Sequence, residues 1–152
     1  MKALVAYYSY SGTTRIAAEQ IHQLAGGDIF EIIAETPYPE DFNEVVEQAR
    51  KEIAEGYKPK LQNDPPDISE YDAVIVGTPN WCSTIAPPLA TFLASQDFTG
   101  KRLLTFVTHG TGGLGRCMSD IKQLCPTAQV EDGFDANFME NANDWLSSLG
   151  II

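Results

Sequence analysis

Four hydroxyl side chains lie close together near the start of the sequence, in the stretch SYSGTT. They are Ser9, Ser11, Thr13 and Thr14, and Gly12 lies among them. A helical pattern begins directly afterwards, so the unpaired N–H groups of its first turn would face this stretch. Hydroxyls, a closely approaching glycine backbone and the positive end of a helix dipole can together bind phosphate without a lysine. We therefore predict a phosphate-binding loop. The alternative is that these hydroxyls only cap the helix, but capping alone would need one of them and not four.

The residues around this loop exclude several phosphate-dependent activities. The patterns GxxxxGK and GxGxxG are both absent after the first strand. Ser9 and Arg15 have the spacing of the cysteine phosphatase loop, but a serine lacks the low-pKa thiolate that this chemistry uses. The apolar stretch VIVGT ends in Gly77 and Thr78 without an aspartate, which excludes phosphoryl transfer to an aspartate. We expect Arg15 to lie on the helix without a role in the site.

Two further stretches could contact a ligand. TPNWCST contains Trp81, whose indole would cover a planar ligand or, as an equally open alternative, pack into the core. THGTGGLG contains glycines at positions 110, 112, 113 and 115, which let backbone amides approach a ligand or simply form a mobile turn.

The elements that would position these stretches follow a regular alternation. Apolar stretches predict buried strands at Lys2 to Tyr8, Val74 to Gly77 and Leu103 to Val107, with weaker edge strands at 27–35 and 128–134. Helical patterns cover residues 13–27, 39–56, 87–96, 114–126 and 141–150. This alternation predicts one doubly wound α/β domain over residues 1–152 with right-handed crossovers. Its ligand site should lie outside the carboxyl ends of the strands, where all three stretches begin.

A phosphate loop, an aromatic plate and a glycine-rich edge together suit a mononucleotide with a planar conjugated head, and FMN fits all three. The chain has no lysine or arginine between Lys60 and Lys101, so the second stretch brings no positive charge to the ligand. Acidic surroundings would disfavour further negative charge on a flavin and lower the potential of its most reduced, anionic form.

The composition limits the classes of partner that the chain can have. A formal net charge of -11 over 152 residues argues against nucleic acid, and suits either a basic protein partner or solubility alone. No apolar run approaches the roughly 20 residues of a membrane helix, and no secretory signal is visible, so we expect a cytoplasmic protein. The three cysteines lack the spacing of a disulfide framework or a zinc site, and no metal site is predicted.

The motifs Ser9-Tyr10-Ser11-Gly12-Thr13-Thr14, YDAVIVGTPNW, GKRLLTFVTHGTGGLG and PYPEDFNEVVEQARKEIAEG resemble a bacterial subgroup of the flavodoxin family, in its short-chain form. The resemblance covers nearly the whole chain. It implies a flavodoxin-like three-layer sandwich, with a five-stranded parallel sheet in the order 2-1-3-4-5 and helices on both faces. It also implies FMN bound without a covalent link, and one-electron transfer between redox enzymes.

The resemblance assigns the FMN phosphate to the first stretch, one flavin face to the second and the pyrimidine edge to the third. The residues so assigned are Ser9, Tyr10, Ser11, Gly12, Thr13, Thr14, Thr78, Pro79, Asn80, Trp81, Cys82, Ser83, Thr108, His109, Gly110, Gly113, Leu114 and Gly115. Two departures matter. Trp81-Cys82-Ser83 replaces Trp-Trp-Gly, and the third stretch offers His109 or Leu114 where well-known members stack a tyrosine on the outer flavin face.

The resulting hypothesis is an electron carrier without a substrate of its own, acting as a monomer with a reductase and an acceptor enzyme. Its docking face would combine the acids of the predicted helix at 39–56 with an acidic tail that contains Glu131, Asp132, Asp135, Glu140 and Asp144, although these acids could also be merely solvated. The alternative is an NAD(P)H-dependent, FMN-containing quinone or flavin reductase, which would use an open flavin face. A third possibility is a binding module that holds no flavin.

Overall fold

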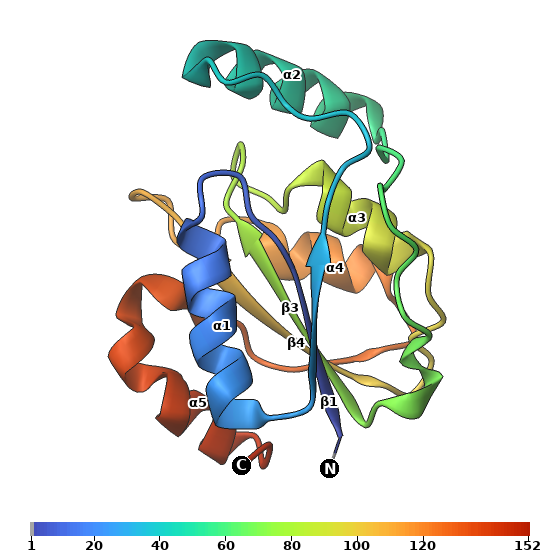
Figure 1. Ribbon diagram of the computed structural model, residues 1–152, viewed down its shortest axis with the longest axis vertical. Coiled ribbons are helices and arrows are strands. Elements are labelled where there is room, and N and C mark those ends of the chain that lie inside the picture. The colour runs from blue at the N-terminus through green and yellow to red at the C-terminus, as the bar shows by residue number, and fades with distance from the viewer. Residues whose placement is uncertain (1) are drawn as a thin grey trace.

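The computed structural model describes residues 2–152, and its centre is a parallel β-sheet (Figure 1). The strands are β1 (Ala3–Tyr8), β2 (Asp28–Ile32), β3 (Ala73–Pro79), β4 (Arg102–Thr108), β5 (Gln129–Val130) and β6 (Phe134–Asp135). Their order is β2-β1-β3-β4-β5. β6 also pairs with β4, further along that strand than β5 does. The predicted fold class and strand order are therefore confirmed.

The fifth strand of the predicted sheet is divided into two short pieces. β5 pairs with Arg102 and Leu103, whereas β6 pairs with Phe106 and Val107, all on the same neighbour β4. Residues 131–133 lie between the two pieces and belong to neither strand, although the Glu131 N–H still donates to the Leu103 carbonyl over 2.9 Å. A Cβ at Gly133 would lie 2.6 Å from the sulfur of Met118, so the interruption brings backbone closely against a side chain of α4.

Helices cover both faces of the sheet. α1 (Thr13–Ala25) and α5 (Ala142–Ser148) pack on one face, and α3 (Pro87–Ala94) and α4 (Cys117–Leu124) pack on the other. Short 3₁₀ helices, η1 (Ile68–Glu70) and η2 (Ala136–Asn141), complete the chain together with α2 (Phe42–Glu55). All six residues of β1 are buried, as expected for a central strand with helices on both sides. Among the described residues, no helix is long and apolar enough to cross a membrane.

The buried side of α1 agrees only in part with the predicted one. The apolar pattern of residues 13–27 predicts a buried face with Ile16, Ala17, Gln20, Ile21 and Leu24, but Ile16 is 59% exposed, and Gln20 and Leu24 are also exposed. The helix buries Ala17 and Ile21 as predicted, together with Thr14 and Ala18. The two alanines let α1 lie close to the sheet, and Thr14 faces inward because its hydroxyl finds a buried partner.

α2 lies beyond the carboxyl ends of the strands (Figure 1) and contacts α3. It belongs to residues 36–59, here named the α2 arm, whose two ends lie side by side. There an antiparallel bridge joins Ala34 to Leu61, and the Glu35 N–H donates to the Lys60 carbonyl over 2.8 Å. The apolar pattern of residues 39–56 predicts a stripe with Phe42, Val45, Val46, Ala49 and Ile53. Val45 and Ala49 are buried as predicted, whereas Phe42 is 75% exposed at the first turn of α2.

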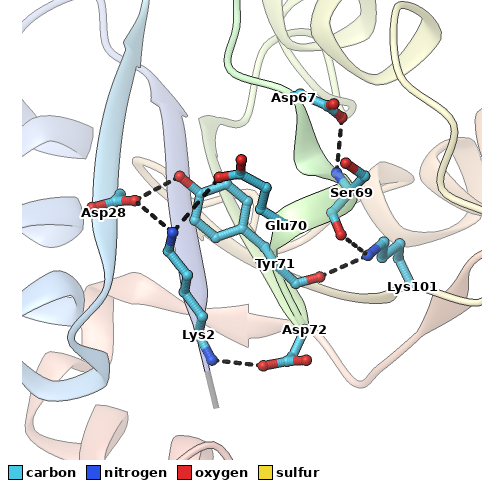
Figure 2. A network of polar contacts seen from close by, with 8 residues as sticks. All are labelled: Lys2, Asp28, Asp67, Ser69, Glu70, Tyr71, Asp72 and Lys101. Carbon is cyan, nitrogen blue, oxygen red and sulfur yellow. Dashed lines mark hydrogen bonds and ion pairs between the residues drawn. The ribbon is translucent and has the colours of Figure 1, made fainter.

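A network of polar contacts lies at the opposite, amino end of the strands (Figure 2). The Tyr71 hydroxyl donates to Asp28 over 2.6 Å, and the Lys2 N–H donates to Asp72 over 2.7 Å. Lys101 donates to the Tyr71 carbonyl over 2.8 Å. The bond to Asp28, helped by burial, raises the pKa of Tyr71 to about 12. The network ties η1 to β1, β2 and the start of β4, far from the predicted ligand site.

Candidate functional site

The three stretches predicted to bind a ligand meet at the carboxyl edge of the sheet. Thr14 and Thr108, from the first and third stretches, have hydroxyl oxygens 2.7 Å apart. Asn80, from the second, donates its backbone N–H to the Thr108 carbonyl over 2.8 Å and its side-chain amide to the Gly113 carbonyl over 2.9 Å. The fold therefore brings together residues that lie up to about a hundred positions apart.

The hydroxyls of the first loop divide into two roles. Ser9 Oγ accepts the N–H groups of Gly12 and Arg15, over 3.1 and 3.2 Å, and so caps the start of α1. Thr14 is buried and bonded to Thr108. The exposed hydroxyls are those of Ser11 and Thr13, whose oxygens lie 3.4 Å apart. These two hydroxyls and the first N–H groups of α1 are the groups that could hold an anion.

Gly12 and Arg15 fit this arrangement in different ways. Gly12 has φ +99°, which favours glycine, and a Cβ there would meet no atom within 4 Å. The space beside the loop is therefore open. Arg15 donates to Glu31 of β2 over 2.7 Å, a hydrogen bond that raises the pKa of its guanidinium. Its charge is thus directed to the neighbouring strand, as expected for a residue without a role in the site.

The second loop contains a tight turn that the sequence did not reveal. Trp81 and Thr84 exchange backbone hydrogen bonds of 2.8 and 3.0 Å across Cys82 and Ser83. Cys82 has φ 53° and Ser83 has φ 71°, so two non-glycine residues adopt the left-handed conformation. That conformation costs roughly 1–2 kcal/mol per residue, and Asn-Gly is the usual sequence for such a turn. Backbone strain is therefore concentrated in the loop assigned to a flavin face.

Hydrogen bonds fix the ends of the second loop. The Thr78 hydroxyl is buried, accepts the Ala86 N–H over 3.0 Å and donates to the Pro79 carbonyl over 2.8 Å. Thr78 therefore shapes the loop through both of its hydroxyl hydrogen bonds. The Ser83 carbonyl accepts the Arg116 N–H over 2.6 Å, which joins the second loop to the end of the third.

Trp81 is half-buried within a cluster of aromatic rings. Tyr8, Tyr10 and Tyr38 pack edge-on against it, at ring-centre distances of 5.5, 5.8 and 5.0 Å. Beside the cluster, a cavity of about 430 Å³ separates residues Asn80–Ser83 from α2, with Tyr10 and Phe42 in its lining. Trp81 thus packs on the core and also borders the carboxyl edge, so both of its expected roles keep support.

A buried carboxylate anchors α2 to this aromatic cluster. Glu52 accepts the Tyr38 hydroxyl over 2.6 Å and the Gln48 amide over 2.8 Å. Burial, followed by the bond to Glu52, raises the pKa of Tyr38 far above that of a free tyrosine, and burial does the same for Tyr8. Glu52 gave no signal of this role in the sequence, because a glutamate on a helix normally faces solvent.

The third loop is held by Asp135 of β6 and Asn137 of η2. His109 Nε2 lies 2.8 Å from both carboxylate oxygens of Asp135. Asn137 accepts the His109 N–H over 3.2 Å and donates to the His109 carbonyl over 2.7 Å. The His109 side chain is only 10% exposed, and Leu114 is half-buried against the core. Neither residue extends outward as a plate for a flavin face.

Glycines allow the second and third loops to approach each other closely. Gly115 has φ +50°, and a Cβ there would lie 2.5 Å from the Ser83 carbonyl oxygen. Gly113 has φ +62°, and a Cβ there would meet no atom within 4 Å. The stretch is therefore more than a mobile turn, since one of its glycines is required by close packing.

The acidic tail is only partly free to meet a partner. Glu131 accepts from Arg102 over 2.9 Å, and Asp135 is bonded to His109. Asp132, Glu140 and Asp144 remain exposed. Two of the five acids are therefore paired within the fold, and the other three are the ones that a partner could contact.

The cysteines have two different environments. Cys117 and Cys125 are buried, and burial raises their pKa values to about 12 and about 11. Cys82 is exposed in the strained turn. Over the described part of the chain, no three His, Cys, Asp or Glu side chains group as metal ligands.

Comparisons with known proteins agree with this architecture. A proposed flavoprotein from Bacteroides eggerthii is 28% identical, with a TM-score of 0.89 over 98% of each chain. A flavoprotein from Lactobacillus acidophilus, solved in complex with FMN, is 25% identical, with a TM-score of 0.79 over 95% of this chain and 97% of that one. An NAD(P)H dehydrogenase (quinone) from Caulobacter vibrioides is 34% identical over 114 residues, or 72% of this chain.

The match to the Caulobacter protein covers 52% of that protein, so the chain spans about half the length of the curated relatives it matches. The family model described as Flavodoxin matches residues 2–149, nearly the whole sequence. With the strand order and the three loops at the carboxyl edge, this match shows that the chain belongs to the flavodoxin family.

Proposed function

We propose that the chain binds FMN without a covalent link and transfers electrons between redox proteins. The observation that carries the proposal is the meeting of the three loops through the Thr14–Thr108 and Asn80–Thr108 hydrogen bonds. Ser11, Thr13 and the start of α1 would bind the phosphate. The second and third loops would hold the isoalloxazine ring, as the FMN complex of the Lactobacillus relative supports.

The groups around the proposed phosphate site are neutral, and this neutrality affects both phosphate binding and the reduction potential of a bound flavin. Hydroxyls and backbone N–H groups donate hydrogen bonds to a phosphate without adding positive charge, since Arg15 is paired with Glu31. FMN, when bound, supplies the ability to accept and release one or two electrons. An acidic protein stabilises extra negative charge on the ring poorly, which favours a low reduction potential.

A redox titration followed by absorbance tests the electron-carrier function. The FMN-loaded protein should be reduced in two resolved one-electron steps. It should also need an added reductase to accept electrons from NADH or NADPH. A single unresolved two-electron step would count against the carrier.

A second candidate is an NAD(P)H-dependent quinone or flavin reductase. Its support is the name of the Caulobacter relative, together with the absence of an outward side chain at His109 and Leu114. An open ring face would admit a nicotinamide or a quinone. Stopped-flow mixing of the FMN-loaded protein with NADH or NADPH and a quinone separates the two candidates, because repeated turnover without another protein would identify the reductase.

The proposal extends to partners and location. We expect a single domain over residues 1–152, acting as a cytoplasmic monomer, with no nucleic-acid partner. Redox partners with basic surfaces would dock near the exposed Asp132, Glu140 and Asp144. Electron transfer to such a partner should slow as ionic strength rises, and a rate independent of salt would exclude this docking surface.

A further inference from the structure

Four oxidisable rings lie in contact beside the carboxyl edge of the sheet. Trp81 is at the centre, and Tyr8, Tyr10 and Tyr38 pack edge-on around it, with Tyr38 nearest at a ring-centre distance of 5.0 Å. The Trp81 side chain is half-buried, whereas Tyr8 and Tyr38 are buried. Because electron transfer falls off steeply with distance, an electron passes most readily between rings that are in contact. The cluster therefore connects a partly exposed indole with buried phenols.

The three tyrosines differ in the group that accepts their phenolic hydrogen. The Tyr38 hydroxyl donates to the Glu52 carboxylate over 2.6 Å. The Tyr10 hydroxyl donates to the Pro39 carbonyl over 2.5 Å, and an amide carbonyl is too weak a base to take a proton. Tyr38 is therefore the tyrosine of this cluster whose hydroxyl is bonded to a base, and oxidation of a phenol requires a base to receive its proton.

Glu52 is suited to receive that proton. It is buried on α2, and the donors to its two oxygens are neutral groups, the Tyr38 hydroxyl and the Gln48 amide. None of the ion pairs found in residues 2–152 includes Glu52. A buried carboxylate without a cation is costly to keep charged.

The resting protein nevertheless keeps this proton on Tyr38. Burial, followed by the bond to Glu52, raises the pKa of the Tyr38 phenol. Loss of an electron reverses the preference, because an oxidised phenol is a strong acid. The proton is therefore expected to move to Glu52 only when Tyr38 is oxidised.

We propose that this cluster is a radical relay, in which Trp81, once it has lost an electron to a one-electron oxidant, regains one from Tyr38 while the Tyr38 proton moves to Glu52. The indole radical cation takes up one electron and becomes neutral tryptophan again. The O–H bond of Tyr38 breaks, and a new O–H bond forms on Oε1 of Glu52. The products are a neutral tyrosyl radical and a neutral carboxylic acid.

The change in charge favours this transfer. Before it, the half-buried indole is positive and the buried Glu52 carboxylate is negative. Afterwards both groups are neutral, which removes the cost of holding charge away from water. The relay protects Trp81 and the exposed Cys82 beside it from further oxidation, since the radical leaves the edge of the sheet. A one-electron reductant such as ascorbate restores the phenol, which takes its proton back from Glu52. No bound cofactor takes part, so this function is separate from the proposed electron carrier.

Pulse radiolysis of the full chain without added flavin tests the relay. Azide radicals oxidise indole in preference to buried phenol, and Trp145→Phe leaves Trp81 as the single tryptophan of the chain. Absorbance should show the indole radical decaying while a tyrosyl radical appears at the same rate, whatever the protein concentration. The rate should be lower in D2O than in H2O, because the proton moves with the electron.

Two results of this measurement would overturn the relay. The first is an indole radical that decays without forming a tyrosyl radical, or at a rate that rises with protein concentration. The second is an equal rate in H2O and D2O, which would show that the electron moves without the proton. Neither result depends on whether the chain binds FMN.

Variants in the Trp145→Phe background identify the end of the relay. Tyr38→Phe should abolish the tyrosyl radical that forms as the indole radical decays. Glu52→Gln keeps an oxygen that can accept the phenol hydrogen bond but cannot hold the proton, so the transfer should be at least about tenfold slower. Tyr57→Phe, at an exposed position outside the cluster, is the matched control and should leave the rate unchanged.

Tyr10→Phe distinguishes the two tyrosines that donate hydrogen bonds. It removes the phenol that is bonded to a carbonyl, and the tyrosyl radical should still form. Loss of the radical in Tyr10→Phe but not in Tyr38→Phe, or an unchanged rate in Glu52→Gln, would overturn the assignment to Tyr38 and Glu52.

Discussion

The buried hydroxyls of Thr14 and Thr108 lie 2.7 Å apart and join the first turn of α1 to the end of β4. Each is the other's buried partner, and each belongs to a different loop of the proposed site. Thr14→Val should therefore leave the Thr108 hydroxyl unpaired and lower the free energy of unfolding by about 1–3 kcal/mol. Urea denaturation would measure this change.

The double variant Thr14→Val, Thr108→Val is the control for that experiment. It removes both polar groups together, so it should recover much of the stability lost in the single variant. Additive losses in the two single variants would show that the hydroxyls do not depend on each other.

The turn at Cys82 and Ser83 provides a test of stored strain. Ser83→Gly should raise the free energy of unfolding by up to about 1 kcal/mol, because glycine adopts φ 71° without the steric cost. Gln20→Gly, on the exposed side of α1, controls for the flexibility that glycine adds to the unfolded chain and should lower stability by about 1 kcal/mol. A loss of stability in Ser83→Gly would mean that the turn is not strained.

Tyr71 should make stability sensitive to alkaline pH. Folding raises its pKa from 10.0 to about 12, so the folded state favours the neutral phenol that donates to Asp28. This contribution is complete below pH 10.0 and is lost as the pH rises through about 12. In chemical denaturation from pH 8 to pH 12, the stability difference between wild type and Tyr71→Phe should be constant at first and then shrink. A constant difference throughout would contradict the assignment.

The bond between Tyr38 and Glu52 should hold the α2 arm in place. Tyr38→Phe leaves a buried carboxylate with one donor fewer, so residues 36–59 should be cut faster by a protease under native conditions. Tyr57→Phe, at an exposed position near the end of the arm, is the matched control. Equal cleavage rates in wild type, Tyr38→Phe and the control would show that the arm is held by other contacts.

The sequence was sufficient to predict the fold and the meeting of the three candidate loops at one edge of the sheet. Buried parallel strands are continuous apolar runs, and their carboxyl ends meet at one edge, so three short stretches could be placed together without a structure. The strained turn was missed because Cys82 and Ser83 are not turn-forming residues, and only the close approach of Gly115 to Ser83 reveals the packing around it. The exposure of Ile16 and Phe42 was missed because helical periodicity does not show which side has a neighbour.

Long-range polar pairs were beyond sequence reasoning for a different reason. His109 and Asp135 lie 26 positions apart, and nothing local distinguishes Asp135 from the other acids of its segment. Their pairing depends on β6 lying beside β4, where Val107 is paired with Asp135. The pairing of Glu52 with Tyr38 could not be predicted from the sequence either, because it depends on how the α2 arm packs against the rest of the domain.

The most direct test of the central claim compares FMN with riboflavin, which has the same ring but no phosphate. Titration of the ligand-free protein, followed by flavin fluorescence, gives both Kd values. We predict one FMN per chain and at least about tenfold weaker binding of riboflavin, because Ser11, Thr13 and the start of α1 would contact only the phosphate. Equal affinities for the two ligands, or no binding of FMN, would contradict the proposed site.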